Sequence, residues 1–156
     1  MEGILIGLEN WSVAEYFRNA RWGYALLNAI HIFGVSLLIG ATVLMNMRLL
    51  GFWSSVRRSD VIKIGMPIAV IGLSLTILAG LLLFSVRAQE YAALGMFQIK
   101  LILVFTGTVS AILLHWRFGR VLDGLTQRRR ICHALLSLFC WPGALLFGRL
   151  IAFADS

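Results

Sequence analysis

Four long apolar segments dominate the pattern of hydrophobic and polar positions along the chain. They cover residues 22–47, 64–86, 96–116 and 131–153. Each has about the 20 residues that an α-helix needs to cross the hydrocarbon core of a bilayer. Because each segment is apolar on nearly all sides, the pattern gives little indication of which helix face lies inside. The sequence therefore predicts an all-α fold, an integral membrane bundle of four transmembrane helices.

The first 21 residues have a different pattern from these segments. In residues 12–20 the apolar side chains fall on one helical face, and polar side chains cover much of the rest. Ser12 followed by Glu15 fits a capping box that would begin a helix there. We therefore predict an interfacial amphipathic helix within residues 1–21 and a four-transmembrane-helix domain in residues 22–156.

The composition also indicates a membrane protein. Of the 156 residues, 60% are hydrophobic and only 13% are charged, whereas soluble domains have roughly 25% charged residues. This apolar surplus is too large for one buried core, so lipid must solvate part of the surface. No part of the chain has the pattern of a soluble catalytic domain, and it contains no HExxH, GxSxG, P-loop or CxxCH motif.

The net charge of +7 is distributed unevenly between the two sides of the membrane. Four spans place both termini on one side, called side A here, and the opposite side is side B. The cations of the side-B segments are Arg48, Arg57, Arg58, Lys63, Arg117, Arg120, Arg128, Arg129 and Arg130. Outside the spans, side A has only Arg18, Arg21 and Arg87. The positive-inside rule makes side B cytoplasmic, so we expect a bacterial inner-membrane protein with both termini periplasmic. Such cations indicate contact with anionic lipid rather than with nucleic acid.

Polar residues within the apolar segments form two candidate clusters. An ionisable group inside a bilayer is costly, so each is a candidate functional residue. The outer cluster, nearer side A, comprises Asn28, His31, Lys100 and Arg149. The inner cluster, nearer side B, comprises Arg48, His115, Trp116 and His133.

Histidines in an apolar bundle are typical of haem b, whose iron takes axial nitrogen ligands from imidazole. By helical rise, His31 and His115 differ in depth by roughly 14 Å, too far apart to share one iron. His115 and His133, from the ends of successive helices, are expected at similar depth and are the plausible pair of axial ligands. At His31 the second position would be filled by a residue such as Met96 or one of a partner chain, or it would be open.

Other residues would complete such a site. Lys100 and Arg149 would neutralise haem propionates or bind a quinone carbonyl, and Arg48 lies close to the level of the inner histidines. Gly34, three residues after His31, would leave space for a porphyrin edge.

The same residues also have purely structural interpretations. The histidines would then bond other helices or lie at headgroup level, and Lys100 and Arg149 would extend to surface A. The methionines would be packing residues rather than copper ligands. Cys132 and Cys140, eight residues apart, are interpreted as small buried hydrophobes.

Several short motifs resemble those of a known family. The first span has H-x-x-G followed by R-L-L-G, the third has a lysine near its start and a histidine at its end, and the fourth ends in G-R-L-I-A-F. From about residue 22 to 153 the chain resembles a family of small bacterial inner-membrane proteins described only as a domain of unknown function. It is more distantly similar to D-type copper-resistance membrane proteins and to small haem b membrane cytochromes. The matching positions are His31, Gly34, Arg48, Leu49, Leu50, Gly51, Lys100, His115, Gly148, Arg149 and Leu150.

The chain departs from that family at two kinds of position. An acidic residue is common in the family where this chain has Asn28 or Asn46, and His133 is not part of its pattern.

Our leading hypothesis is a haem b-binding subunit that transfers electrons between the quinone pool and a periplasmic redox partner. One alternative is a cofactor-free structural or assembly subunit of a larger membrane complex. Another is a copper-handling membrane protein that uses His31 and nearby methionines.

Overall fold

The computed structural model describes residues 2–119, 122 and 124–154, and this part of the chain is helical without a strand. Arg120, one of the side-B cations, lies outside the described residues. The seven helices of this part are α1 (Glu2–Glu9), α2 (Ser12–Asn19), α3 (Arg21–Leu50), α4 (Arg58–Val86), α5 (Ala88–Ala93), α6 (Gly95–Phe118) and α7 (Gln127–Ala154).

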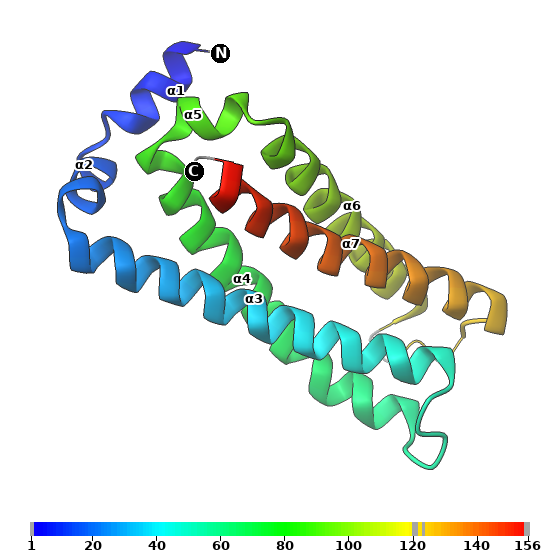
Figure 1. Cartoon of the computed structure of the whole chain (residues 1–156). Coiled ribbons are helices and arrows are strands. Elements are labelled where there is room, and N and C mark those ends of the chain that lie inside the picture. Colours follow the sequence, from blue (N-terminus) through cyan, green and yellow to red (C-terminus); the bar gives the residue numbers. More distant parts are fainter. Residues whose placement is uncertain (1, 120–121, 123, 155–156) are drawn as a thin grey trace.

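The helices α3, α4, α6 and α7 are long and apolar enough to cross a membrane, which confirms the prediction of four spans. Both chain ends lie at the same end of these four helices, which is side A (Figure 1). The main difference from the predicted bounds is that α4 begins at Arg58 rather than at residue 64. Pro67 therefore lies inside a helix, where it cannot donate a hydrogen bond to the carbonyl four residues earlier.

The N-terminal region contains two short helices, α1 and α2, instead of the one predicted. The N-cap of α2 is Trp11, and no side-chain capping bond forms, so the predicted Ser12–Glu15 capping box is wrong. The sequence analysis also missed α5, on which α1 is docked. The carboxylate of Glu9 accepts hydrogen bonds from the Gln89 backbone N–H at 2.9 Å and from its side-chain amide at 2.7 Å.

Glycines set the close packing of α3 against α4. A Cβ atom on Gly34 would lie 2.8 Å from the backbone nitrogen of Thr76, and one on Gly72 would lie 2.5 Å from that of Leu38. Side chains do not fit at these distances, so the two backbones meet directly, as small residues allow in membrane helices. The space beside Gly34, where the sequence analysis placed a porphyrin edge, is therefore filled by α4.

The second pair of helices, α6 and α7, packs around a buried cysteine. A Cβ atom on Gly107 would lie 3.2 Å from both Cys140 and Trp141, and Cys140 belongs to a buried cluster with Leu103 and Ala144. Cys132 is exposed, so the interpretation of both cysteines as buried is wrong for this one.

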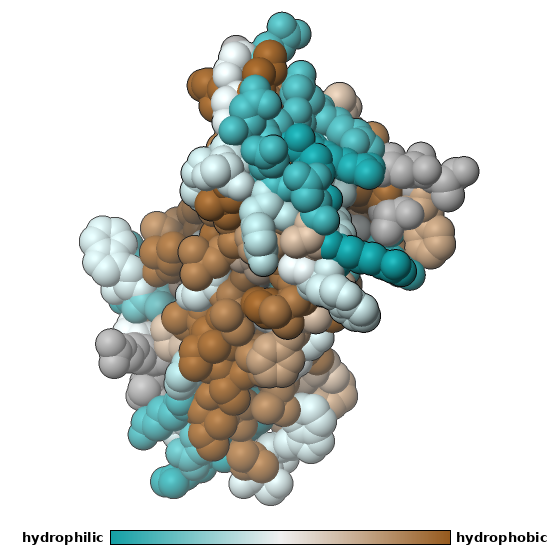
Figure 2. All heavy atoms as spheres, turned by 90° about the vertical axis from the view of Figure 1, so that its left-hand side faces the viewer, coloured by the Kyte–Doolittle hydropathy of each residue, from teal (hydrophilic) through white to brown (hydrophobic). Residues whose placement is uncertain are grey.

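The α3–α4 pair contacts the α6–α7 pair along α3 and α7, but the two pairs are separated on the opposite side. The Asn46 side-chain amide donates a 2.7 Å hydrogen bond to the Ser137 hydroxyl across the α3–α7 contact. In contrast, no Cα atom of α4 lies within 8 Å of one in α6, although both helices are described throughout. The bundle is therefore open between α4 and α6. Its exterior is largely apolar. Figure 2 shows hydrophobic residues over the middle and lower part of one face, with hydrophilic residues above them and at the lower end.

Candidate functional site

A cavity of about 380 Å³ lies on the side of the bundle where α4 and α6 are separated. Its walls come from all four spanning helices and from Leu122, and they are mostly aliphatic. A small number of polar side chains interrupt this lining: Thr42, Asn46, Thr108, Ser110, His115, His133 and Ser137. An apolar pocket with a few polar groups is typical of a binding site for a small organic ligand.

The cavity is closed toward side B and has an apolar rim between α4 and α6. At the side-B end, Ile62 and Leu114 pack with Leu122 and Leu125 in one buried cluster. On the rim, exposed apolar residues of both helices line the cavity. Val70 of α4 and Ile112 of α6 are 53% and 61% exposed. In a membrane, lipid covers such residues, so the opening faces the acyl chains and not water.

His115 of α6 has one nitrogen bonded and the other buried without a partner. Its Nδ1 lies 2.8 Å from the Ala111 carbonyl oxygen. A carbonyl oxygen only accepts hydrogen bonds, so Nδ1 carries a proton, and in the neutral ring Nε2 presents a lone pair. Neither His115 Nε2 nor Thr108 Oγ1 has a hydrogen-bond partner among the described residues. Both residues line the cavity.

His133 of α7 lines the same cavity. Its Nδ1 lies 3.5 Å from the Ser110 hydroxyl oxygen, so the ring is level with Ser110. The His115 ring reaches back to the carbonyl oxygen of Ala111, the residue next to Ser110. The structure thus brings His115 and His133 to one cavity, with both rings near residues 110 and 111 of α6.

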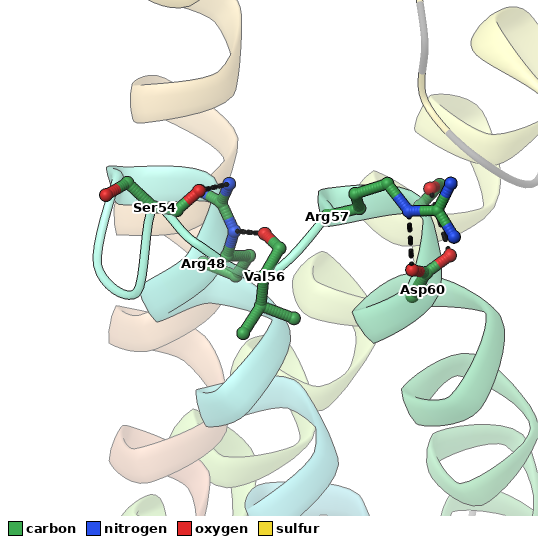
Figure 3. A network of polar contacts seen from close by, with 6 residues as sticks. Arg48, Ser54, Val56, Arg57 and Asp60 are labelled. Carbon is green, nitrogen blue, oxygen red and sulfur yellow. Dashed lines mark hydrogen bonds and ion pairs between the residues drawn. The ribbon is translucent and has the colours of Figure 1, made fainter.

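The other members of the inner cluster lie outside this cavity. Arg48 donates hydrogen bonds from Nε to the Val56 carbonyl oxygen at 2.7 Å and from a terminal nitrogen to that of Ser54 at 3.5 Å (Figure 3). It therefore fastens the loop between α3 and α4, where Arg57 pairs with Asp60 at 2.9 Å. Trp116 is 85% exposed, on the outside of the bundle.

The outer cluster is only partly assembled. His31 donates from Nδ1 to the Thr76 carbonyl oxygen at 3.0 Å and lies against Gly80. The Lys100 side chain lies over Gly148 of α7.

The remaining outer residues lie apart from this pair. Asn28 and Arg149 are exposed, and the Arg149 guanidinium lies 4.8 Å from the centre of the Phe153 ring. Met96, the suggested second ligand of His31, is also exposed.

These positions fit haem only in part. The proton on Nδ1 of His115 leaves Nε2 as a ligand atom, which is the usual state of a metal-binding histidine. However, Arg48 is hydrogen-bonded within the loop between α3 and α4, and α4 fills the space beside Gly34. Among the described residues there is no group of three or more His, Cys, Asp or Glu that could hold a metal ion.

The sequence analysis missed the hydroxyl groups that line the cavity. It named Asn46 only as a departure from a family pattern and did not mention Ser137, Thr108 or Ser110 as site residues. The signal was present in α6, where Thr108 and Ser110 precede His115 in an apolar segment. Their common cavity depends on how the four helices pack, which an all-round apolar pattern does not indicate.

The chain has no match among known proteins in the comparisons made: no protein-family model, curated protein or solved structure matches it.

Proposed function

We propose that the protein is an electron-transfer subunit of the membrane that binds a lipophilic redox ligand in the α4–α6 cavity. The observation that carries this proposal is the direction of the opening. The cavity is closed toward side B by an apolar cluster and is rimmed by exposed apolar residues between α4 and α6. A ligand that enters through such a rim comes from the bilayer, so it is lipophilic.

The residues of the cavity favour redox chemistry over ion transport. The four apolar segments contain no carboxylate that would form a proton or cation relay. They do place an imidazole with a free Nε2 beside an aliphatic pocket. An Nε2 lone pair can bind haem iron, and it can also accept a hydrogen bond from a hydroxyl group such as that of a quinol.

The distribution of cations supports an orientation for this subunit. Side B has most of the arginines, including exposed Arg57, Arg117, Arg128 and Arg129, and these favour the cytoplasmic face and anionic lipid. We therefore place the protein in a bacterial inner membrane with both termini periplasmic. Its redox partner would then be another membrane subunit or a periplasmic protein at side A.

Haem b is a second candidate for the ligand, favoured by the protonation state of His115. When bound, haem would supply one-electron chemistry, and His115 would be the residue that holds it. The hydrogen bonds of Arg48 to the loop between α3 and α4 favour a smaller ligand without propionates.

Two measurements on detergent-purified protein test the proposal. A reduced-minus-oxidised visible spectrum detects haem, and an organic extract analysed by mass spectrometry detects a quinone or another redox lipid. We expect about one redox ligand per chain and a large loss of it in His115→Ala. His31→Ala is the matched control, because His31 lies outside the cavity, and it should keep the ligand.

Other results would contradict the proposal. Protein with no haem and no redox lipid, but with other chains bound stoichiometrically, would indicate a structural or assembly subunit. Stoichiometric copper that is lost in His31→Ala and kept in His115→Ala would indicate copper handling.

A further inference from the structure

Two polar atoms of the cavity lack partners among the described residues, and both belong to α6. They are His115 Nε2 and Thr108 Oγ1. The two residues are seven positions apart, which is close to two helical turns, so they share one helix face about 10 Å apart along the axis. A buried polar group without a partner is costly. The two atoms therefore mark where a ligand has its own polar groups.

The hydrogen-bonding roles of these two atoms differ. Nδ1 of His115 donates to the Ala111 carbonyl oxygen, so in the neutral ring Nε2 is an acceptor. The Thr108 hydroxyl can donate or accept. The ligand must therefore present a donor at the His115 end, and it can present either kind of oxygen at the Thr108 end.

We infer that the ligand is a quinol, a flat apolar ring with a hydroxyl group at each of two opposite ends. One hydroxyl donates to His115 Nε2, and the other bonds Thr108 Oγ1 across the ring. The ring lies among aliphatic wall residues such as Leu73 and Ile112, and its isoprenoid tail leaves between α4 and α6. This inference rests on the proposed function, because it names the ligand of the same cavity.

The inference predicts that the cavity distinguishes the two redox states of its ligand. An oxidised quinone would place a carbonyl oxygen against His115 Nε2. Both atoms are hydrogen-bond acceptors, so no hydrogen bond forms between them. Losing one buried hydrogen bond corresponds to about a tenfold loss of affinity. The site therefore binds the quinol about tenfold more tightly than the quinone.

The test is an anaerobic equilibrium titration of the full-length protein in lipid nanodiscs. The probes are a short-chain benzoquinol and the matching benzoquinone, and empty nanodiscs measure partition into lipid. His115→Phe keeps a planar ring but removes the acceptor, so it should weaken quinol binding about tenfold and leave quinone binding nearly unchanged. Thr108→Val should weaken both forms. Thr106→Val, on the same helix but outside the cavity, should weaken neither.

The outcomes separate this inference from the proposed function. Equal affinity for quinol and quinone in the unchanged protein, or equal losses of both forms in His115→Phe, would overturn the inference. The proposed function would still stand if a redox ligand is bound and is lost in His115→Ala. If neither probe binds above the nanodisc blank and the purified protein contains no redox ligand, both proposals fail.

Discussion

The Asn46 amide donates a 2.7 Å hydrogen bond to the Ser137 hydroxyl, and this bond joins the two helix pairs along α3 and α7. Asn46 is buried, and lipid offers no substitute partner for its amide. Both residues also line the cavity. The bond therefore stabilises the wall that lies opposite the opening between α4 and α6.

Removing either partner of this bond should destabilise the bundle. We expect Asn46→Ala and Ser137→Ala each to lower the free energy of unfolding by about 1 kcal/mol, the usual size for interhelical bonds in membranes. Reversible unfolding in mixed micelles measures this change. Ser36→Ala is the control, because Ser36 is exposed and bonds only the Ile32 carbonyl of its own helix. In a double-mutant cycle, the double variant should lose less unfolding free energy than the two single variants together. A loss equal to the sum of the single losses would contradict a direct bond.

The close contact of α3 with α4 predicts a contrast between two glycines of one helix. Gly34→Ala would push a methyl group within 2.8 Å of the Thr76 backbone nitrogen, so we expect it to lower the free energy of unfolding by about 1–3 kcal/mol. Gly40 has no other atom within 4 Å of its added Cβ atom. Gly40→Ala should be neutral or stabilise the helix by up to about 1 kcal/mol. Similar losses in both variants would contradict the packing described here.

The docking of α1 on α5 should depend on pH through Glu9. Hydrogen bonds from Gln89 hold the pKa of the Glu9 carboxyl below its ordinary value, with a smaller contribution from Arg18. A lowered pKa means that the ionised form stabilises the docked state. This stabilisation is complete above the ordinary glutamate pKa and is lost as the pH falls through the lowered value.

A spin label at the exposed position of Gly3→Cys, in a Cys132→Ser background, measures the mobility of α1. Its mobility should rise only at acidic pH. With Glu9→Gln added, mobility should already be high at neutral pH and should not change on acidification. Glu15→Gln is the control. A rise in mobility that is the same with and without Glu9→Gln would contradict the role of Glu9.

The proposed orientation predicts which loops are accessible from outside the cell. In the Cys132→Ser background, Gly3→Cys lies at side A and Ser55→Cys lies in the exposed loop between α3 and α4 at side B. A membrane-impermeant maleimide should label Gly3→Cys in intact spheroplasts, and it should label Ser55→Cys only after lysis. The reverse pattern would place side B outside and contradict the positive-inside assignment.

The spanning helices could be predicted from the sequence because their signal is local. Length and apolar character alone define a span, so all four were found. The N-terminal region was harder. No clear pattern in the sequence marks the break at Asn10 and Trp11 that separates α1 from α2, and α5 is only six residues long.

The candidate site was less predictable, because it depends on which helices stay apart. His115 and His133 were named from their residue type, and they do line one cavity. That they share a cavity depends on how α7 packs against α6, which no single segment encodes. The partners of Arg48 are backbone carbonyls of a loop, and such bonds carry no sequence signal.

The most direct test of the ligand-binding cavity is to fill it. Ala111 lines the cavity from α6, so Ala111→Phe should occupy the space of the ligand, whereas Ala29→Phe adds the same ring at an exposed position of α3 outside the cavity. The measurement is the amount of redox ligand that remains with each protein after purification from its native membrane. We predict about one ligand per chain in the unchanged protein and in Ala29→Phe, and a loss of most of it in Ala111→Phe. Equal ligand content in the two phenylalanine variants would contradict binding in the α4–α6 cavity.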